Sequence, residues 1–284
     1  MSTFNKQSSH TADGLVYIRS LMDIPFAKEI WAILQKSGGI SSEDMIRATR
    51  GTFMYPFMEA RYLMTDLEIA KSGADQIFEL ASGLTPRGIA MTASPTIMYV
   101  EFDLPDKLEE KKKIIDQLVA EGNIAPRNNL YLESGDVTDT TNFERASRHF
   151  TNRPVAVVCE GLLRYVSPTD RKALADNIHT LLKKYGGIWT TPDAEFFDPE
   201  KTPEEEKKRF EERFEKLGYD VRPNLFKDAE DAEMFFRECG FDVAKYPAIS
   251  MIDKLVLPKR MGLKKEDVIR CLTNRFCFTM TVAA

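Results

Sequence analysis

Short apolar runs alternate with longer amphipathic stretches along the chain from residue 76 onward. This alternation is typical of β-α-β units, in which buried parallel strands are joined by helices that cover the sheet. Seven runs have the length and composition of strands: QIFEL (76–80), TIMYVEF (96–102), NLYLES (129–134), VAVVCE (155–160), IWTTP (188–192), FDVAKY (241–246) and RFCFTMTV (275–282).

Between these runs lie segments with apolar residues at helical spacing and with recognisable start and stop signals. Gly122, Gly186 and Gly240 close three such segments, and the second opens at Ser167 or Thr169 as its N-cap. The pattern predicts an α/β protein with a doubly wound, seven-stranded, mostly parallel sheet of the Rossmann-like kind.

Two parts of the chain stand outside this alternation. Residues 1–74 carry helical patterns and no evident strand, and they predict a helical N-terminal extension to a main domain at 75–284. Residues 198–220 are dense in charge, with apolar residues at helical spacing. Two interpretations of this insertion stay open: a solvated helix with one packed stripe, or a lid over the ends of the fourth and fifth strands.

Composition narrows the class of protein. The 284 residues include 39 basic and 44 acidic side chains, a net charge of −5, which argues against a broad nucleic-acid surface. No apolar run is long enough to cross a membrane and no secretory leader is evident, so we expect a cytoplasmic location. The four cysteines and three histidines lack metal-ligand spacing, which predicts buried free thiols and no metal site.

Ligands of doubly wound sheets bind outside the carboxyl ends of the strands, so we examined the residues that follow each strand. The first strand leads into Ala81-Ser82-Gly83, where small residues let a ligand approach the backbone. Thr85 and Pro86 then supply an N-cap and the first residue of a helix. The next three strands end near acids: Glu101 and Asp103, then Asp136, then Glu160.

This set of strand ends indicates a site poor in positive charge. A dinucleotide or a triphosphate needs basic groups and free helix N-termini near its phosphates. An adenosine ligand without phosphates, carrying a positive sulfonium and an ammonium group, fits these residues better. S-adenosylmethionine is such a ligand.

Two segments resemble a known family. QIFELASGLTPRGIAMTASPTIMYVEFDLPDK (76–107) and VAVVCEGLLRYVSPTD (155–170) are similar to the S-adenosylmethionine-dependent methyltransferases related to leucine carboxyl methyltransferase and to polyketide O-methyltransferases. EFDLP and EGLLRYVSP match the family's E-x-D-x-P and AEGLLMYL motifs in order and separation. The resemblance covers about residues 55–192.

The resemblance implies a role for each matching residue. It places Ala81 and Gly83 beside the methionine part of the cofactor, Asp103 at the ribose with Glu101 as a second acid, and Asp136 with Val137 at the adenine amino group. It also implies that Glu160 faces the charged methionine end, that Arg61 pairs with the cofactor carboxylate from a helical cap (1–74), and that Tyr165 is either core or a wall of the substrate pocket.

The turn departs from the family at two positions. Ala81-Ser82-Gly83 lacks the family's second glycine, and Thr85 stands where an aspartate is common, although Arg87 matches the family arginine. Alanine fits such a turn if its φ angle stays negative. Several residues also have structural alternatives: Asp103 as an N-cap, Asp136 as a turn residue, and Arg61 as an ordinary ion-pair residue.

Methyl transfer from a sulfonium requires alignment of nucleophile, methyl and sulfur, and a carboxylate acceptor needs no general base. For a hydroxyl acceptor the candidate bases are His149, His179, Tyr165 and Asp193, none of them favoured. The expected function is O-methyl transfer to a carboxylate or hydroxyl of a small molecule or of a protein end. The alternatives are an inactive methyltransferase-like binding protein and, less favoured, a nicotinamide-dependent oxidoreductase.

Overall fold

The computed structural model describes residues 14–37, 54–198 and 220–283, with isolated positions between 199 and 219. A seven-stranded sheet with the order β3-β2-β1-β4-β5-β7-β6 forms its centre. All of its strand pairs are parallel except those of β7, which runs antiparallel to β5 and β6. The predicted fold class is confirmed.

Each predicted strand is present, with bounds shifted by at most two residues. The strands are β1 (Gln76–Leu80), β2 (Met98–Asp103), β3 (Leu130–Ser134), β4 (Val155–Cys159), β5 (Gly187–Thr191), β6 (Phe241–Pro247) and β7 (Phe276–Val282). β1 and β4 are buried along their whole length, as expected of central strands covered on both faces.

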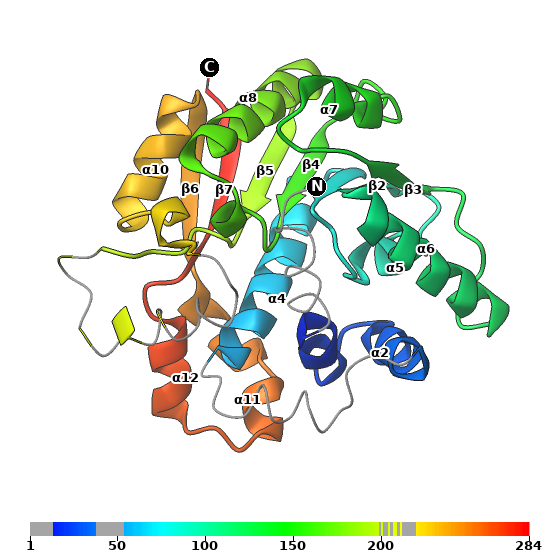
Figure 1. The fold of residues 1–284 in the computed structure, drawn as a ribbon, viewed down its shortest axis with the longest axis horizontal. Coiled ribbons are helices and arrows are strands. Elements are labelled where there is room, and N and C mark those ends of the chain that lie inside the picture. Colours follow the sequence, from blue (N-terminus) through cyan, green and yellow to red (C-terminus); the bar gives the residue numbers. More distant parts are fainter. Residues whose placement is uncertain are drawn as a thin grey trace.

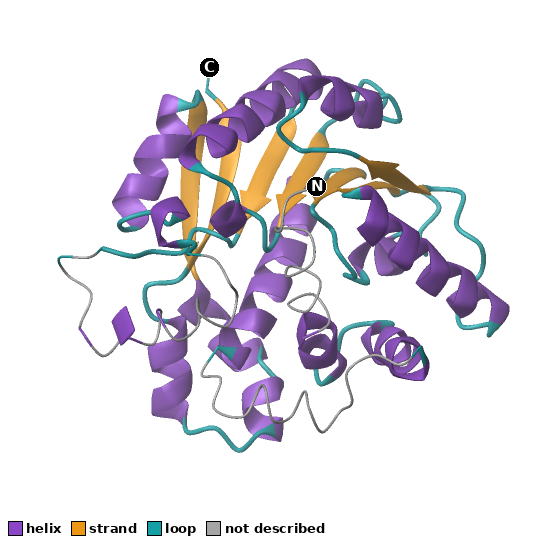
Figure 2. Cartoon of the chain, in the orientation of Figure 1, coloured by secondary structure: helices purple, strands orange, loops and turns teal. Residues whose placement is uncertain are grey.

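Helices cover both faces of the sheet (Figures 1 and 2). Phe78, Phe102 and Val157 pack beneath α7 (Thr140–Ser147) and α8 (Pro168–Tyr185), in one large core. Strand residues of the opposite parity, such as Ile77 and Tyr99, pack beneath α4 (Tyr55–Ser72). Alternation of side chains along each strand therefore separates the two cores.

The remaining helices are α2 (Ala27–Lys36), α5 (Arg87–Met91), α6 (Pro105–Ala120), α10 (Ala229–Glu238), α11 (Leu257–Arg260) and α12 (Lys265–Leu272). Residues 14–20 are also helical. Three short 3-10 helices follow β4, precede α10 and follow β6, at η1 (Leu163–Tyr165), η2 (Arg222–Asn224) and η3 (Ala248–Lys254). No described helix is both long and apolar enough to reach across a membrane.

Local sequence explains where α8 begins and ends. The Ser167 side chain accepts a hydrogen bond from the Asp170 backbone N–H, and Pro168 occupies the first turn. At the other end Gly186 takes a positive φ of 72°, which favours glycine. Of the two predicted N-caps, Ser167 is the one observed.

Two predictions for helical segments fall on residues that the structure does not describe. One is the segment SSEDMIRA, in which Ser41 and Asp44 have the spacing of a capping box at the start of a helix. The other is the 198–220 insertion, most of which lies outside the described residues, so its two interpretations stay open.

α4 lies against β4, β5 and β7 and against η3, α11 and α12 from the C-terminal part of the chain. The domain boundary at residue 74 stays a prediction.

Candidate functional site

The strand order reverses between β1 and β4, so their carboxyl ends mark the point where doubly wound sheets bind ligands. Ala81 follows β1 directly and Glu160 follows β4 directly. Leu80 and Phe102 are partners in the parallel register, which brings the turn after β1 beside Asp103 at the end of β2. Residues far apart in the sequence therefore meet at one edge.

Asp103 holds the turn after β1. One of its carboxylate oxygens accepts a hydrogen bond from the Gly83 backbone N–H at 2.6 Å, and the other accepts from the Leu104 N–H at 2.7 Å. Burial raises the pKa of Asp103, and these two backbone donors oppose that rise. Each oxygen keeps a lone pair, so the same carboxylate can also accept from the hydroxyls of a ribose.

The turn is held in a conformation that favours glycine. Ala81 has a φ of 52° and Gly83 a φ of 51°. The expectation of a negative φ at Ala81 is therefore wrong, because the chain must reverse here between β1 and α5. A left-handed conformation costs an L-residue about 1–2 kcal/mol. The helix also begins one residue later than expected, with Pro86 at the N-cap position and Arg87 as its first residue.

Three arginines converge on Glu160. Arg19 contacts Oε1 at 2.8 Å, Arg61 contacts the same oxygen at 3.1 Å, and Arg87 contacts Oε2 at 2.7 Å. All four side chains are buried. Burial alone would raise the pKa of Glu160, but the three cations outweigh it and lower that pKa overall. The carboxylate is therefore ionised at neutral pH.

Arg87 links this carboxylate to two further acids. Its guanidinium binds Asp66 from α4 at 2.7 Å and Glu79 from β1, and it lies over the ring of Tyr62 at 4.2 Å. The hydroxyl of Tyr99 donates to the other oxygen of Glu79 at 2.9 Å. The strand ends therefore hold both signs of charge, and the expectation of a site poor in positive charge is wrong.

Glu101 is not at the edge. It lies in the middle of β2, paired in register with Glu79 and Leu132, and its side chain is completely buried. Its carboxylate forms an ion pair with Lys111 of α6. It also lies directly beneath Gly88, where an added Cβ would come within 2.2 Å of Oε1. The expectation that Glu101 lies beside the ribose at the strand ends is therefore wrong, because this carboxylate is buried within the core.

Asp136 and Val137 follow β3, beside Asp103, whose register partner is Ser134. Asp136 accepts hydrogen bonds from the Thr138 backbone N–H at 2.8 Å and from its hydroxyl at 2.7 Å. The Val137 carbonyl accepts from the Asn177 amide at 3.0 Å. The turn role expected as the alternative for Asp136 is present, and its role toward adenine stays a prediction.

The four candidate bases have distinct surroundings. Asp193, after β5, accepts from the backbone N–H groups of Gly161 and Leu162. Burial raises its pKa to about 6, although Arg61 opposes the rise. Tyr165 is half-buried in η1. His149 pairs with Glu133 on β3, and His179 packs edge-on against Phe241 within α8.

Sequence reasoning missed two of the charged groups around Glu160. Arg19 lies within the apolar run LVYIRSLM, where a charged residue on a buried helix requires a partner. Glu79 is likewise an acid within the buried strand QIFEL. Both signals are visible in the sequence, but neither identifies the partner, because the contacts are made between distant segments.

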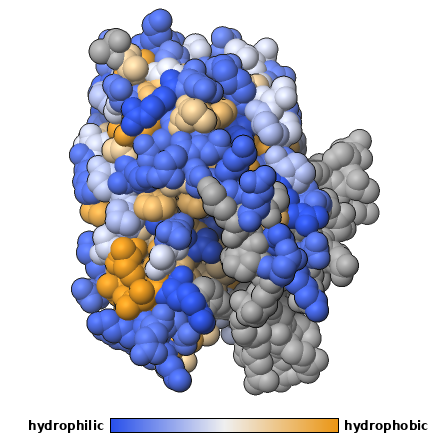
Figure 3. Space-filling view, turned by 90° about the vertical axis from the view of Figure 1, so that its left-hand side faces the viewer, coloured by the Kyte–Doolittle hydropathy of each residue, from blue (hydrophilic) through white to orange (hydrophobic). Residues whose placement is uncertain are grey.

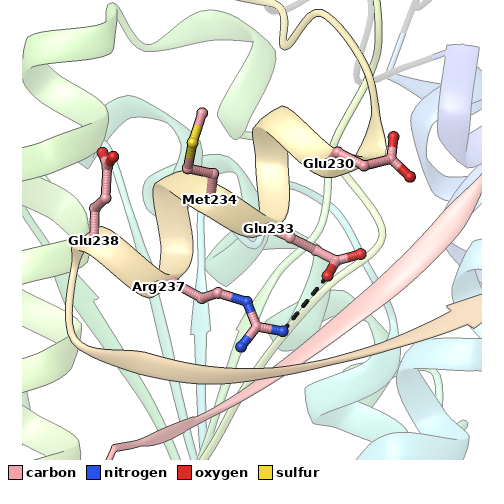
Figure 4. A pocket seen from close by; sticks show the side chains of 5 residues that line it. All are labelled: Glu230, Glu233, Met234, Arg237 and Glu238. Atoms are coloured by element: carbon pink, nitrogen blue, oxygen red, sulfur yellow. Dashed lines mark ion pairs between the residues drawn. The ribbon is translucent and has the colours of Figure 1, made fainter.

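A surface hollow of about 430 Å³ lies elsewhere, along α10 (Figure 4). The residues that line it belong to this one helix: Glu230, Glu233, Met234, Arg237 and Glu238. α10 packs on β6, which is at the opposite edge of the sheet from β3 (Figure 1). The face of the molecule in Figure 3 is mostly hydrophilic, with one compact apolar group near its lower left and weaker apolar groups elsewhere. The hollow is not part of the strand-end site.

Among the described residues no group of three or more histidine, cysteine, aspartate or glutamate side chains could hold a metal ion. The four cysteines are buried and free, as expected.

The fold and the strand-end site define a class, the Rossmann-like S-adenosylmethionine-dependent methyltransferases. The chain belongs to the leucine carboxyl methyltransferase family, whose family model matches residues 22–179. S-adenosyl-L-methionine is the cofactor that this membership implies.

Individual relatives agree with this assignment. A Mycobacterium marinum protein named "Putative S-adenosyl-L-methionine-dependent methyltransferase" is 30% identical over 188 residues, covering 64% of this chain and 56% of its own. A similarly named protein of Mycolicibacterium smegmatis is 30% identical over 161 residues, covering 56% of this chain and 50% of its own. The chain spans about half the length of the curated relatives it matches.

Solved structures share the fold. A DUF574 family protein from Streptomyces avermitilis has a TM-score of 0.58 at 16% identity, over 99% of this chain and 100% of that one. A Thermobifida fusca protein described as a putative methyltransferase has a TM-score of 0.54 at 15% identity, over 95% and 94%. These likenesses concern the fold alone.

Proposed function

We propose that the protein is an S-adenosylmethionine-dependent O-methyltransferase that acts on a carboxylate or hydroxyl of a small molecule or of a protein end. One observation carries the proposal: buried arginines meet Glu160 after β4, and Asp103 ends β2 on the other side of β1, at the same edge of the sheet. The methionine end of the cofactor bears a carboxylate and an ammonium group. A site with buried cations, an ionised acid and a carboxylate that can bind a ribose therefore complements the carboxylate, the ammonium group and the ribose of the cofactor.

The residues present fit this cofactor. Arg61 pairs with Glu160, and in the proposed complex its guanidinium also contacts the cofactor carboxylate. Glu160 is ionised and can accept from an ammonium group. Asp103 retains lone pairs for ribose hydroxyls. Asp136 and Val137 lie on the adenine side, and Ala81 and Gly83 form the turn beneath the methionine part.

The chemistry supplied by the bound cofactor is an electrophilic methyl group on sulfonium sulfur. The protein orients the acceptor and keeps water out, and correct alignment accounts for most of the acceleration of such a displacement. A carboxylate acceptor is already nucleophilic. A hydroxyl acceptor needs a proton acceptor, and Asp193, which follows β5 and whose pKa burial raises to about 6, is one candidate.

Family membership favours this function over the nicotinamide-dependent alternative. It does not separate an active enzyme from an inactive binding protein on the same fold. The left-handed conformation of Ala81 supports the second candidate, the inactive binding protein, because it strains the turn on which the cofactor would lie.

Labelled methyl transfer tests the proposal. The protein is incubated with methyl-labelled S-adenosylmethionine and cell extract, and products are treated with mild base. Base-labile label indicates a methyl ester and hence a carboxylate acceptor, whereas base-stable label on oxygen indicates a hydroxyl acceptor. Cofactor binding without label transfer to any fraction would support the inactive binding protein, and label on nitrogen or carbon would contradict O-methyl transfer.

A further inference from the structure

Glu79 is a buried acid with no assigned role in the site described above. It lies within β1, and its side chain is only 2% exposed. One carboxylate oxygen binds Nη1 of Arg87, and the other accepts a hydrogen bond from the Tyr99 hydroxyl at 2.9 Å. Protein donors therefore occupy both oxygens, so any effect of Glu79 on a ligand is exerted through these two neighbours.

The Arg87 guanidinium is shared among three acids. Its Nε binds Asp66 at 2.7 Å, its Nη1 binds Glu79, and its Nη2 binds Glu160 at 2.7 Å. A guanidinium is planar and presents its N–H donors in fixed directions, so three separate partners determine its orientation. Because Nε and Nη1 are taken by Asp66 and Glu79, the described contacts leave Nη2 for Glu160.

The charges of this ion-paired group balance. It consists of three arginines and three acids: Arg19, Arg61, Arg87, Asp66, Glu79 and Glu160. The methionine end of the proposed cofactor is a zwitterion and also carries no net charge. A balanced group can take up such a ligand without leaving an unpaired buried charge, which would be costly. Loss of the negative charge of Glu79 would leave an excess cation beside Glu160.

We infer that Glu79 is a positioning residue for the cofactor's ammonium group: it holds Nη1 of Arg87, balances part of the arginine's charge, and so leaves Glu160 able to accept from the ammonium. Without Glu79, Arg87 pairs more strongly with Glu160 and repels the ammonium. Tyr99 supports this arrangement, because its hydroxyl orients the Glu79 carboxylate. The inference rests on the proposed function, in which Glu160 faces the ammonium group.

The test compares two ligands that differ only at the methionine end. S-adenosylhomocysteine carries the ammonium and the carboxylate, whereas 5′-methylthioadenosine has the same adenosine and a thioether but no amino-acid end. Calorimetry measures the affinity of each ligand for the wild type and for Glu79→Gln. We expect Glu79→Gln to weaken S-adenosylhomocysteine binding by about 10-fold and 5′-methylthioadenosine binding by less than about 2-fold.

Glu133→Gln is the matched control. Glu133 is an acid of β3 that pairs with Arg145, outside the group around Glu160. This variant should keep the wild-type ratio of the two affinities. A purely structural role of Glu79 would weaken both ligands alike, and equal losses in Glu79→Gln would overturn the inference.

Nitrogen-15 NMR of the arginine side chains supplies a readout that needs no ligand. The Arg87 signals are identified by their absence in Arg87→Lys. Rotation about the Cζ–Nη1 bond should be slow in the wild type and faster in Glu79→Gln, because Nη1 loses its ionised partner. Equal rotation in both proteins would overturn the inference. A folded wild type that binds neither ligand would instead contradict the proposed function, and the NMR comparison would still decide whether Glu79 holds Arg87.

Tyr99→Phe replaces Glu79→Gln if that variant does not fold. It removes one hydrogen bond to Glu79 and no charge. We expect S-adenosylhomocysteine binding to weaken by about 3-fold with 5′-methylthioadenosine binding unchanged. A wild-type ratio of the two affinities in Tyr99→Phe would then overturn the inference.

Discussion

Arg87 and Glu160 are 73 residues apart in the sequence, and their side chains meet at 2.7 Å where both are almost completely buried. Arg87 opens the helix after β1, and Glu160 directly follows β4. The contact therefore ties together the two strands between which the sheet reverses its order. It also fixes the position of the ionised acid that we propose for the cofactor's ammonium group.

Glu160→Gln should strongly destabilise the protein, because three buried arginines would then face a neutral amide. Loss of one member of a buried ion pair costs about 3–5 kcal/mol. Urea denaturation measures the change. Glu109→Gln on α6 is the matched control, since it removes an exposed partner of Lys113 and should have no measurable effect. Equal free energies of unfolding for Glu160→Gln and Glu109→Gln would contradict the conclusion that the buried ion pairs of Glu160 stabilise the fold.

Asp103→Asn should weaken cofactor binding by about 1–3 kcal/mol, because charge-assisted hydrogen bonds to the ribose are lost. Calorimetry with S-adenosylhomocysteine measures this loss. Asp106→Asn is the control, since Asp106 is exposed in the first turn of the neighbouring helix. An unchanged affinity in Asp103→Asn would leave Asp103 only its observed role, which is to hold the backbone of Gly83 and Leu104.

Ala81→Gly should not destabilise the protein, and we expect a gain of up to about 1 kcal/mol, because glycine relieves the left-handed strain. Ala70→Gly in α4 is the control, an exposed helical position where the same change should cost about 1 kcal/mol. Thermal denaturation of both variants gives the comparison. If Ala81→Gly lowered the stability as much as Ala70→Gly, the backbone at Ala81 would not be strained.

The stability of the protein should carry a pH-dependent contribution from Asp193. Burial raises its pKa from 3.8 to about 6. Because the folded-state pKa lies above the unfolded one, this contribution is full below pH 3.8 and is lost as the pH rises through 6. The stability difference between wild type and Asp193→Asn should therefore shrink by about 2 kcal/mol from pH 4.5 to pH 8.

Urea denaturation of both proteins at several pH values checks the sign. Glu160 has a lowered pKa and acts in the opposite direction, but it is present in both proteins and cancels in the difference. A difference that grows with pH would show that Asp193 is stabilised as an anion.

The strands and the fold class could be predicted because local pattern determines them. Runs such as VAVVC have no amphipathic period and must be buried on both faces, and glycine or proline marks their ends. The antiparallel direction of β7 has no such local signal, since it depends on how the C-terminal segment returns to the sheet.

The charges of the site could be predicted only in part. Asp103 and Glu160 were predicted as site residues because they lie at the ends of predicted strands and match family motifs. Glu101 satisfied the same criteria, yet it points into the core, since its place within β2 directs the side chain toward Lys111. Lys111 itself lies in the polar run EEKKK, where nothing distinguishes a buried lysine from exposed ones.

The arginines around Glu160 show a further limit of local patterns. Arg19, Arg61 and Arg87 come from three different helical segments, and only tertiary packing brings them to one carboxylate. The φ angle of Ala81 was likewise set by the path of the chain between β1 and α5, against the preference of alanine itself.

Calorimetric titration of the folded protein with S-adenosylhomocysteine, with NAD as the comparison, tests the central claim most directly. We predict saturable binding of one S-adenosylhomocysteine per chain that weakens in Asp103→Asn, and no heat with NAD. Absence of binding by S-adenosylhomocysteine and S-adenosylmethionine, with the protein shown to be folded, would contradict the account.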